Sequence, residues 1–180
     1  MADEYYTLHV AGLERQLKLF PVNEHMSIAA FILFGDVELC EHCADALLEK
    51  CPAFDYIVTP EAKSIPLAYE MSRKSGKKYI VARKSIKVYM DRPEKACVRS
   101  ITTQKEQTIY LGHEDGDLLR GKKVLVLDDV VSTGESMEAT VELVKDFGGE
   151  IVAKATVVAE GDAAERDDII YLEKLPLFFH

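Results

Sequence analysis

Two adjacent carboxylates and a turn rich in hydroxyls stand close together in the sequence, within residues 128–136. The apolar run Val124–Leu127 comes directly before them and has the continuous hydrophobicity of a strand covered on both faces. After them, apolar residues recur with helical spacing as far as Phe147. The pattern predicts a strand, a turn and a helix, with Asp128 and Asp129 at the carboxyl end of the strand, where open α/β sheets bind ligands.

This combination suits the binding of a phosphorylated sugar. The carboxylates accept hydrogen bonds from sugar hydroxyls, and the turn supplies N–H groups and hydroxyls at a helix N-terminus, which attracts phosphate. The candidate phosphate ligands are Ser132, Thr133, Gly134, Glu135 and Ser136. An acid beside a phosphate is unfavourable, so Glu135 is expected to face solvent or cap the helix. The alternative is an ordinary helix cap, which needs one such residue rather than the whole set.

Two further segments are expected at the same edge of the sheet, because each follows a predicted strand. Residues 59–64 open the next helix, so their N–H groups would point outward. Arg83 and Lys84 follow another strand. For the first segment, a simple helix cap with Lys63 in solvent is the alternative.

Positive charge is concentrated in one part of an acidic chain. The 180 residues carry a formal net charge of −9, which argues against binding to nucleic acid. Residues 63–105 nevertheless hold 12 of the 22 lysines and arginines and three acids, so the rest has 10 bases and 28 acids. A local basic segment is what a polyanionic small substrate requires, and a solvated basic face is the alternative.

Length and composition indicate one unit. With 180 residues, 48% of them hydrophobic, the chain can bury one sizeable core, and we expect a single domain over residues 1–180. The longest apolar stretch, Ile28–Phe34, is too short to span a membrane, and no leader peptide opens the chain. We therefore expect a soluble cytoplasmic protein that binds no membrane.

Two motifs that suggest other chemistry receive a structural interpretation. Cys40 and Cys43 form a Cys-x-x-Cys pair around His42, but no second ligand pair follows at zinc spacing. We interpret them as structural thiols of an amphipathic helix, with a metal site or redox pair as the alternative. Residues 116–123 fit the spacing of a P-loop, but Lys123 replaces the Ser or Thr and a strand follows, so a surface turn is predicted.

Predicted strands and helices alternate, which indicates an α/β fold with a mainly parallel sheet flanked by helices. Strands are predicted at 6–10, 16–20, 56–59, 79–82, 108–111, 124–127 and 151–158, with short strands or a sheet edge at 169–172 and 177–179. Helices are predicted at about 37–50, at about 66–75 and from the hydroxyl-rich turn to about 147.

The motif at residues 124–137 resembles that of the type I phosphoribosyltransferases: four apolar residues, two acids, two further residues, and a Thr-Gly turn with hydroxyls around it. The resemblance extends from about residue 14 to 175. It implies the fold of that family, with a small N-terminal hood in residues 1–35 and a core in residues 36–175 that binds phosphoribosyl pyrophosphate (PRPP).

The resemblance also implies roles for the candidate residues. Asp128 and Asp129 would contact the ribose hydroxyls of PRPP, and the turn at 132–136 would hold its 5′-phosphate. Arg83 would contact the diphosphate and is counted with the two acids as catalytic. Further implied ligands of the pyrophosphate are Ala62, Lys63, Ser64, Lys84 and Lys87, and the Ala62–Lys63 peptide is expected to be strained or cis.

The implied reaction breaks the bond between C1 of the ribose and pyrophosphate. A flexible loop, matching the basic segment with Lys95, Arg99 and Lys105, would close over PRPP and exclude water. Mg²⁺ would travel largely with the substrate and reach Asp128 and Asp129 through hydroxyls or water, so no residue is assigned as a direct metal ligand.

The base is expected to be a purine, because the chain is most similar to the adenine and xanthine enzymes. Adenine, giving AMP and pyrophosphate in purine salvage, is the first choice. A xanthine or guanine enzyme, an orotate enzyme and a non-catalytic PRPP sensor are alternatives. The segment Ser100–Lys105 departs from the Leu-Glu-Tyr-Gly common in adenine enzymes, and Gly161 departs from the Lys common in xanthine enzymes.

Two apolar positions in the hood, Phe20 and Val22, are candidates for stacking on the base, with core packing as the equal alternative. Phe178 and Phe179 near the C-terminus are expected to be exposed and available to a second subunit. A homodimer is usual in the resembling family and is therefore expected.

Overall fold

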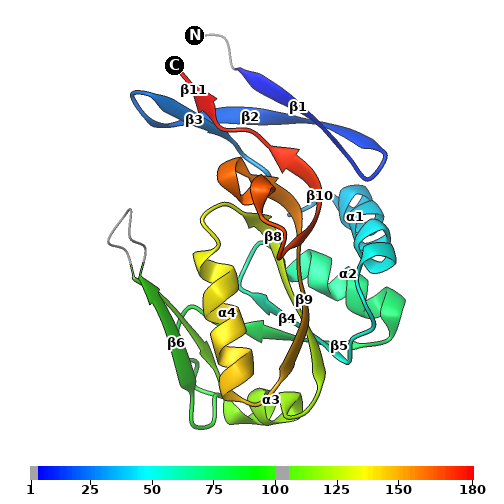
Figure 1. The fold of residues 1–180 in the computed structure, drawn as a ribbon, viewed down its shortest axis with the longest axis vertical. Helices are drawn as coiled ribbons and strands as arrows, with labels where there is room; N and C mark the ends of the chain where they lie inside the picture. The colour runs from blue at the N-terminus through cyan, green and yellow to red at the C-terminus, as the bar shows by residue number, and fades with distance from the viewer. Residues whose placement is uncertain (1–3, 100–105) are drawn as a thin grey trace.

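The computed structural model describes residues 4–99 and 106–180. Its centre is a sheet of five parallel strands in the order β10-β9-β8-β4-β5 (Figure 1). The strands are β4 (Tyr56–Pro60), β5 (Lys78–Ala82), β8 (Lys123–Val131), β9 (Glu150–Glu160) and β10 (Ile170–Leu175). The predicted parallel sheet of an α/β fold is confirmed.

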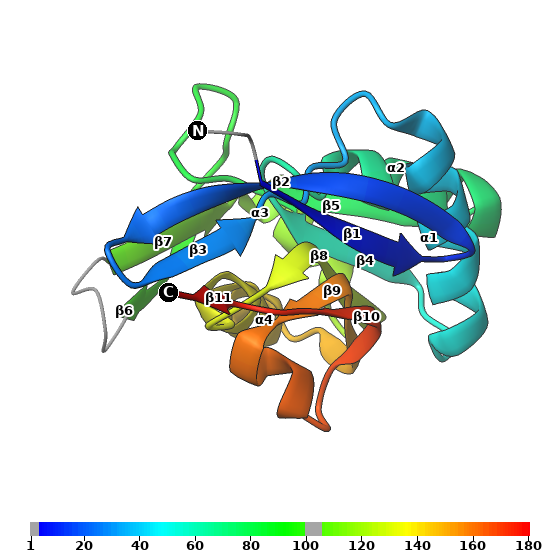
Figure 2. The same ribbon diagram turned by 90° about the horizontal axis from the view of Figure 1, so that it is seen from above.

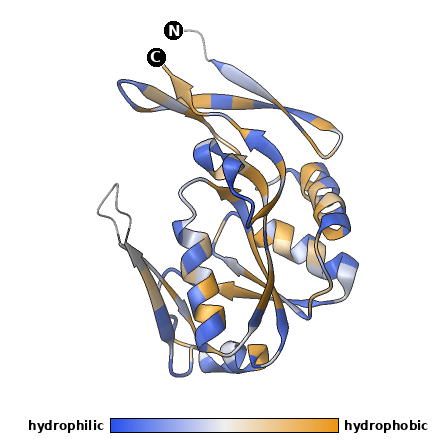
Figure 3. Cartoon of the chain, viewed as in Figure 1, coloured by the Kyte–Doolittle hydropathy of each residue, from blue (hydrophilic) through white to orange (hydrophobic). Residues whose placement is uncertain are grey.

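Helices cover both faces of this sheet. The helices α1 (Val37–Lys50) and α2 (Ile65–Ser75) pack on one face, and α4 (Glu135–Asp146) packs on the other. The central strands are hydrophobic along most of their length (Figure 3), and Val124–Leu127 of β8 is fully buried. Burial on both faces explains the continuous apolar run in the sequence.

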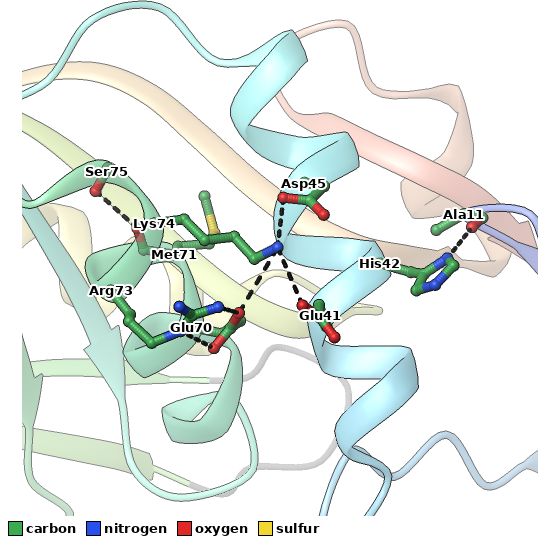
Figure 4. A network of polar contacts seen from close by, with 9 residues as sticks. All are labelled: Ala11, Glu41, His42, Asp45, Glu70, Met71, Arg73, Lys74 and Ser75. Atoms are coloured by element: carbon green, nitrogen blue, oxygen red, sulfur yellow. Dashed lines mark hydrogen bonds and ion pairs between the residues drawn. The ribbon is translucent and has the colours of Figure 1, made fainter.

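Three ionic and polar contacts join α1 to its neighbours (Figure 4). Lys74 of α2 places its Nζ 2.6 Å from Asp45 Oδ1 and 3.7 Å from Glu41 Oε1, both on α1. His42 Nδ1 lies 3.2 Å from the carbonyl oxygen of Ala11, at the turn between the first two strands of the chain. His42 thus has a structural partner, and it joins α1 to the N-terminal part of the fold.

The thiols that the sequence places in α1 are buried. Cys40 and Cys43 face the core, and all cysteines of the chain, each within the described residues, are free. Burial raises the pKa of the Cys40 thiol to about 11 and that of Cys43 to about 12, so both are protonated at neutral pH. The interpretation as structural thiols is confirmed.

A second sheet, called here the hood sheet, is antiparallel and has the order β1-β2-β3-β11 (Figure 2). Its strands are β1 (Tyr5–Val10), β2 (Leu13–Asn23), β3 (Met26–Ala29) and β11 (Phe178–Phe179). The C-terminal residues therefore complete a sheet made by the N-terminal residues. In Figure 1 the hood sheet lies at the end of the molecule toward which β8 and β9 run.

A hairpin of β6 (Glu94–Arg99) and β7 (Glu106–Leu111) packs beside α4, and Tyr110 of β7 bridges to Arg83. The short helices α3 (His113–Gly116) and η1 (Asp117–Leu119) lead into β8, and η2 (Gly161–Glu165) follows β9. The segment with P-loop spacing is thus a turn that precedes a strand, as predicted. Within the described ranges, no helix is long and apolar enough to cross a membrane.

Candidate functional site

Two loops meet at the carboxyl edge of the central sheet because the strands before them, β4 and β8, are neighbours and run in parallel. A pocket of about 240 Å³ lies between these loops. Its lining residues are Pro60, Glu61, Ala62, Lys63, Ser64, Lys84, Asp128, Asp129, Val130 and Ser136. The structure therefore brings together the two acids, the loop after β4 and Lys84, which are far apart in the sequence.

A second pocket of about 180 Å³ adjoins the first and shares Asp128, Val130 and Ser136 with it. The turn at 132–136 forms most of its wall. The two pockets together make one groove with carboxylates at its centre and a loop at either end. Such a groove has room for an elongated ligand with an anionic group at each end and hydroxyls between them.

The two acids lie inside β8 rather than beyond its end, where the sequence placed them. β8 continues to Val131, which pairs with Ala159 of β9, so the strand is longer than the apolar run. Asp128 and Asp129 are consequently 8% and 3% exposed. The backbone N–H of Asp129 donates to Asp128 Oδ1 at 2.9 Å. Burial, followed by the charge of Asp129, raises the pKa of Asp128 well above its ordinary value.

One carboxylate oxygen of this pair has no hydrogen-bond partner among the described residues. Asp129 Oδ2 is buried, and Lys63 Nζ lies 3.8 Å away, too far for a hydrogen bond but close enough for an ion pair. A buried acceptor without a donor lowers the stability of the folded protein. A sugar hydroxyl or a cation that enters the pocket would supply what Asp129 lacks.

The same oxygen provides a test of whether Mg²⁺ suits the site. Carboxylate oxygen is a suitable ligand for this ion. Among residues 4–99 and 106–180, however, no group of three or more His, Cys, Asp or Glu side chains is placed to hold a metal. An Mg²⁺ ion at this site would therefore take few of its ligands from these side chains and would need the others from a bound molecule or water.

The loop after β4 is held by hydroxyls that point into the protein. Thr59 is fully buried, and its Oγ1 lies 2.8 Å from the carbonyl oxygen of Leu127 and 2.7 Å from Ser64 Oγ. Ser64 Oγ lies 3.0 Å from the carbonyl oxygen of Pro60. These contacts join β4, β8 and the start of α2 directly before the two acids. Sequence reasoning missed Thr59, whose only signal was a hydroxyl at the end of a buried strand.

The backbone of this loop differs from expectation in one peptide. The cis bond is Glu61–Ala62, whereas the sequence analysis placed a strained or cis bond at Ala62–Lys63. The expected position was thus wrong by one residue. Lys63 is half-exposed and reaches over the pocket toward Asp129, so its ammonium group remains accessible to a ligand.

Arg83, unlike Lys84, does not line the pocket with the two acids. Its Nε donates to Glu61 Oε2 at 2.5 Å, and its Nη1 donates to the hydroxyl of Tyr89 at 2.7 Å. It lies instead in a separate hollow with Tyr89. Lys87 does not line this pocket either, and its Nζ bonds to Ser85 Oγ. Arg83 and Lys87 are thus outside the lining of the pocket that holds the other candidate pyrophosphate ligands, although Arg83 contacts Glu61 at its edge.

Glu61 is a residue of the site that the sequence did not single out. Its Oε1 accepts from the backbone N–H of Lys84 at 2.8 Å, while Oε2 accepts from Arg83. Burial alone would raise the pKa of Glu61, but the hydrogen bonds from Lys84 and Arg83 outweigh it and hold the pKa below its ordinary value. The carboxylate thus fastens the end of β5 to the loop after β4 and places Lys84 at the pocket.

The turn after β8 has the geometry expected of an anion site at a helix N-terminus. Gly134 caps α4 with a φ of 85°, a left-handed conformation that residues with a side chain rarely adopt. Ser132 and Thr133 are exposed, while Glu135 and Ser136 lie half-buried in the first helical turn. Glu135 therefore neither caps the helix, since Gly134 does, nor lies fully in solvent.

Phe20 and Val22 are exposed on β2, at 46% and 54%, so the structure decides against core packing. Neither lines the groove described above. Phe178 is half-buried and meets the ring of Tyr6 edge-on at 5.3 Å, which corrects the expectation that it is exposed, whereas Phe179 is exposed. The contact of Phe178 with Tyr6 helps to hold β11 onto the hood sheet.

The basic residues assigned to a flexible loop are only partly within the described structure. Lys95 is exposed on β6. Arg99 ends that strand, and nothing is described of its side chain. Lys105, with the rest of Ser100–Lys105, lies outside the described residues.

Comparisons with known proteins agree with this geometry. The family described as "Phosphoribosyl transferase domain" matches residues 38–175. An adenine phosphoribosyltransferase from Desulforamulus reducens is 35% identical over 128 residues, covering 70% of this chain and 72% of that protein. One from Thermotoga sp. is 37% identical over 105 residues, and the match covers 58% of this chain and 59% of that protein. A crystal structure of adenine phosphoribosyltransferase from Thermoanaerobacter pseudethanolicus shares the fold, with a TM-score of 0.71 at 18% identity over 88% of this chain and 95% of that chain.

Proposed function

The chain belongs to the phosphoribosyltransferase family, and on that premise we propose that it transfers the phosphoribosyl group of PRPP to adenine, giving AMP and pyrophosphate. One arrangement supports this most directly: two adjoining pockets share Asp128, with an anion-binding turn at one end and a lysine-bearing loop at the other. PRPP has the matching shape, with a 5′-phosphate, a ribose with two free hydroxyls and a diphosphate. The curated relatives named above are adenine enzymes.

In this proposal each part of PRPP has its own part of the groove. The 5′-phosphate binds the turn formed by Ser132, Thr133, Gly134, Glu135 and Ser136. The ribose hydroxyls donate to Asp128 and Asp129, and the orphaned Oδ2 of Asp129 is one of the acceptors. The pyrophosphate group binds the loop at Ala62, Lys63 and Ser64 and the ammonium of Lys84.

Arg83 and Lys87 are proposed as further ligands of the diphosphate. Both would have to turn toward the pocket, because Arg83 is bonded to Glu61 and Tyr89 and Lys87 to Ser85. The negative charge of bound pyrophosphate would compete with Glu61 for the guanidinium. Glu61 would keep its second bond, to the N–H of Lys84, during that exchange.

The reaction replaces one bond at C1 of the ribose with another. The bond from C1 to the pyrophosphate oxygen breaks and its electrons leave with pyrophosphate, while a ring nitrogen of adenine bonds to C1 through its electron pair and releases its proton to water. Lys63 and Lys84 stabilise the charge that grows on the leaving group, and Asp128 and Asp129 hold the ribose in line with the base. Mg²⁺ bound with PRPP would withdraw charge from the leaving oxygens.

The base is proposed to bind beneath the hood sheet, where the exposed Phe20 and Val22 offer apolar surface to a purine ring. We further propose one domain over residues 1–180, with residues 1–35 as hood and 36–175 as PRPP-binding core, and a homodimer in which Phe179 contributes to the contact. The free thiols are in keeping with a reducing compartment, and a cytoplasmic location is proposed.

The test is release of pyrophosphate from PRPP and Mg²⁺, measured separately with adenine, guanine, hypoxanthine, xanthine and orotate. The Asp128→Asn/Asp129→Asn double variant should lose turnover, and Asp117→Asn, which removes an exposed carboxylate paired with Arg120, should keep it. Turnover of adenine alone supports the proposal. Turnover of another base would replace adenine, and tight PRPP binding without turnover of any base would indicate a PRPP sensor.

A further inference from the structure

Four charged side chains form a cluster on the outer side of the turn at 132–136. Glu138 comes from the first turns of α4, Lys154 from β9, and Arg166 and Asp168 from the segment after η2. Arg166 Nη2 donates to Glu138 Oε1 and to Asp168 Oδ2, both at 2.8 Å, and its Nε donates to Asp168 Oδ1 at 2.8 Å. Lys154 Nζ contacts the same two carboxylates. The family resemblance assigned none of these residues.

The guanidinium of Arg166 packs directly on Gly134. A Cβ atom at residue 134 would lie 2.4 Å from Arg166 Nη1, so the absence of a side chain there is what admits the arginine. Nη1 is also the guanidinium nitrogen that makes no hydrogen bond in the described chain. Because Nε and Nη2 are fixed by Asp168 and Glu138, the plane of the guanidinium is fixed too, and it supports the turn from outside.

The cluster also neutralises negative charge near the N-terminus of α4. Glu135 and Glu138 both lie near this helix N-terminus, where acids favour the helix but repel a bound phosphate. Lys154 and Arg166 balance Glu138 and Asp168, so the four side chains together have no net charge. Hydrogen bonds from Arg166, then from Lys154, hold the pKa of Asp168 well below its ordinary value, so it is ionised at neutral pH. Loss of Arg166 would leave a net charge of −1 beside the turn.

We propose that Arg166 is a positioning residue for phosphate binding: it fixes the turn by packing on Gly134, and it cancels the charge of Glu138 at the helix N-terminus. This inference rests on the proposed function, which places the 5′-phosphate of PRPP in that turn. Arg166 acts through Gly134 and Glu138, so its loss should weaken binding of the 5′-phosphate and leave the chemical step and the pyrophosphate end of the groove unaffected.

Calorimetric titration of Arg166→Ala with ribose 5-phosphate and, separately, with pyrophosphate tests this division. Affinity for ribose 5-phosphate should fall about tenfold, a loss on the scale of a helix-terminus charge effect in a partly buried site. Affinity for pyrophosphate should not change, and in turnover the KM for PRPP should rise while kcat stays within about twofold. Lys174→Ala, which removes a cation of β10 that is paired with Glu165 of η2, is the matched control and should behave as wild type.

Two further variants separate charge from packing. Arg166→Lys keeps the charge without the planar fork and should lose less affinity than Arg166→Ala. Glu138→Gln removes the acid and should bind ribose 5-phosphate more tightly than wild type, an effect that shrinks at high salt and that a merely structural role does not predict. In Arg166→Ala/Glu138→Gln the cluster is neutral again, and part of the lost affinity should return.

The outcomes distinguish the inference from the function beneath it. A wild-type chain that binds neither PRPP nor ribose 5-phosphate would overturn both. Wild-type binding with unchanged affinity in folded Arg166→Ala, or an equal loss for pyrophosphate, would overturn the inference alone. If Arg166→Ala does not fold, Arg166→Lys and Glu138→Gln decide the question. An equal loss of affinity for ribose 5-phosphate and for pyrophosphate in these variants would contradict the inference.

Discussion

The loop after β4 and the turn after β8 border the same groove, and both carry hydroxyls, but the protein uses these hydroxyls differently. Ser64 is 1% exposed, and its hydroxyl contacts Thr59 and the carbonyl oxygen of Pro60 inside the loop. Ser132 and Thr133 are exposed at the other end. The first loop is held by its own buried hydrogen bonds, whereas Ser132 and Thr133 of the second are exposed and Arg166 packs against Gly134 beside them.

This difference shows that a hydroxyl beside an anion pocket is not necessarily a ligand for that anion. In the loop after β4, the groups left for a ligand are backbone N–H groups and the ammonium groups of Lys63 and Lys84. In the turn after β8, they are side-chain hydroxyls and the N-terminus of α4. A ligand's diphosphate would thus meet lysine ammonium groups on long side chains, and its single phosphate would meet hydroxyl and helix dipoles.

The acids between the two ends should give the largest effect. Asp129→Asn removes a buried acceptor charge from the ribose site, and turnover should fall about 10²–10³-fold, as for loss of one preorganised electrostatic group. The same change relieves two buried like charges, so the free energy of unfolding should rise by about 1 kcal/mol. Steady-state kinetics and thermal unfolding measure both. Unchanged turnover would show that the groove is not centred on these acids.

The buried hydrogen bonds of the loop after β4 should contribute to the free energy of unfolding. Thr59→Val removes the donor to the carbonyl oxygen of Leu127 and the partner of Ser64, so the free energy of unfolding should fall by about 1–3 kcal/mol. Thr156→Val is the matched control: Thr156 is equally buried, on β9 of the same sheet, but its hydroxyl has one long contact of 3.3 Å, to the carbonyl oxygen of Val158. Urea unfolding of the two variants should differ, and equal losses would contradict the assigned scaffold role.

The raised pKa of Asp128 should make stability depend on pH in one direction. The folded protein binds this proton more tightly than the unfolded chain, whose Asp128 keeps its ordinary value of 3.8. The stabilisation is therefore complete below about pH 3.8 and is lost as pH rises through the folded pKa, with a slope of at most about 1.4 kcal/mol per unit. Asp128→Asn removes this dependence. The difference in stability between wild type and variant, followed from pH 4 to 8, checks the sign.

The exposed hydroxyls of the turn should give the smallest effect, confined to binding. Ser132→Ala and Thr133→Ala each remove one exposed hydroxyl, so the KM for PRPP should rise about three- to tenfold while the melting temperature stays unchanged. Ser64→Ala should show the reverse, lower stability with a smaller change in KM. If both sets of variants behave alike, the contrast between the two loops does not hold.

Much of the fold could be predicted because its signals are local. The fully buried run Val124–Leu127, the apolar spacing of α1 and the alternation of strands and helices led to the parallel sheet. The end of β8 could not be predicted in this way, since Asp128 and Asp129 look like loop residues. Pairing with β9 as far as Val131 keeps them in the strand, and that pairing depends on another part of the chain.

The candidate site could also be predicted in part. Lys63, Lys84 and the two acids do meet at one pocket, because Lys63 and Lys84 follow β4 and β5, the acids lie near the end of β8, and these parallel strands end at one edge. The placement of Arg83 away from that pocket was not predictable, because it depends on the hydrogen bonds that Glu61 and Tyr89 together make to the guanidinium. Arg166 gave no signal at all: its only mark in the sequence is one more arginine in an acidic chain.

The sequence by itself determined the order of elements and the chemistry available at each strand end, because helical spacing, apolar runs and the Asp-Asp and Thr-Gly motifs act over a few residues. The tertiary structure alone decided which hydroxyls face the groove, which cation rests on Gly134, and that the C-terminal β11 completes the N-terminal hood sheet. These choices depend on burial and charge pairing between distant segments, and no local pattern carries that information.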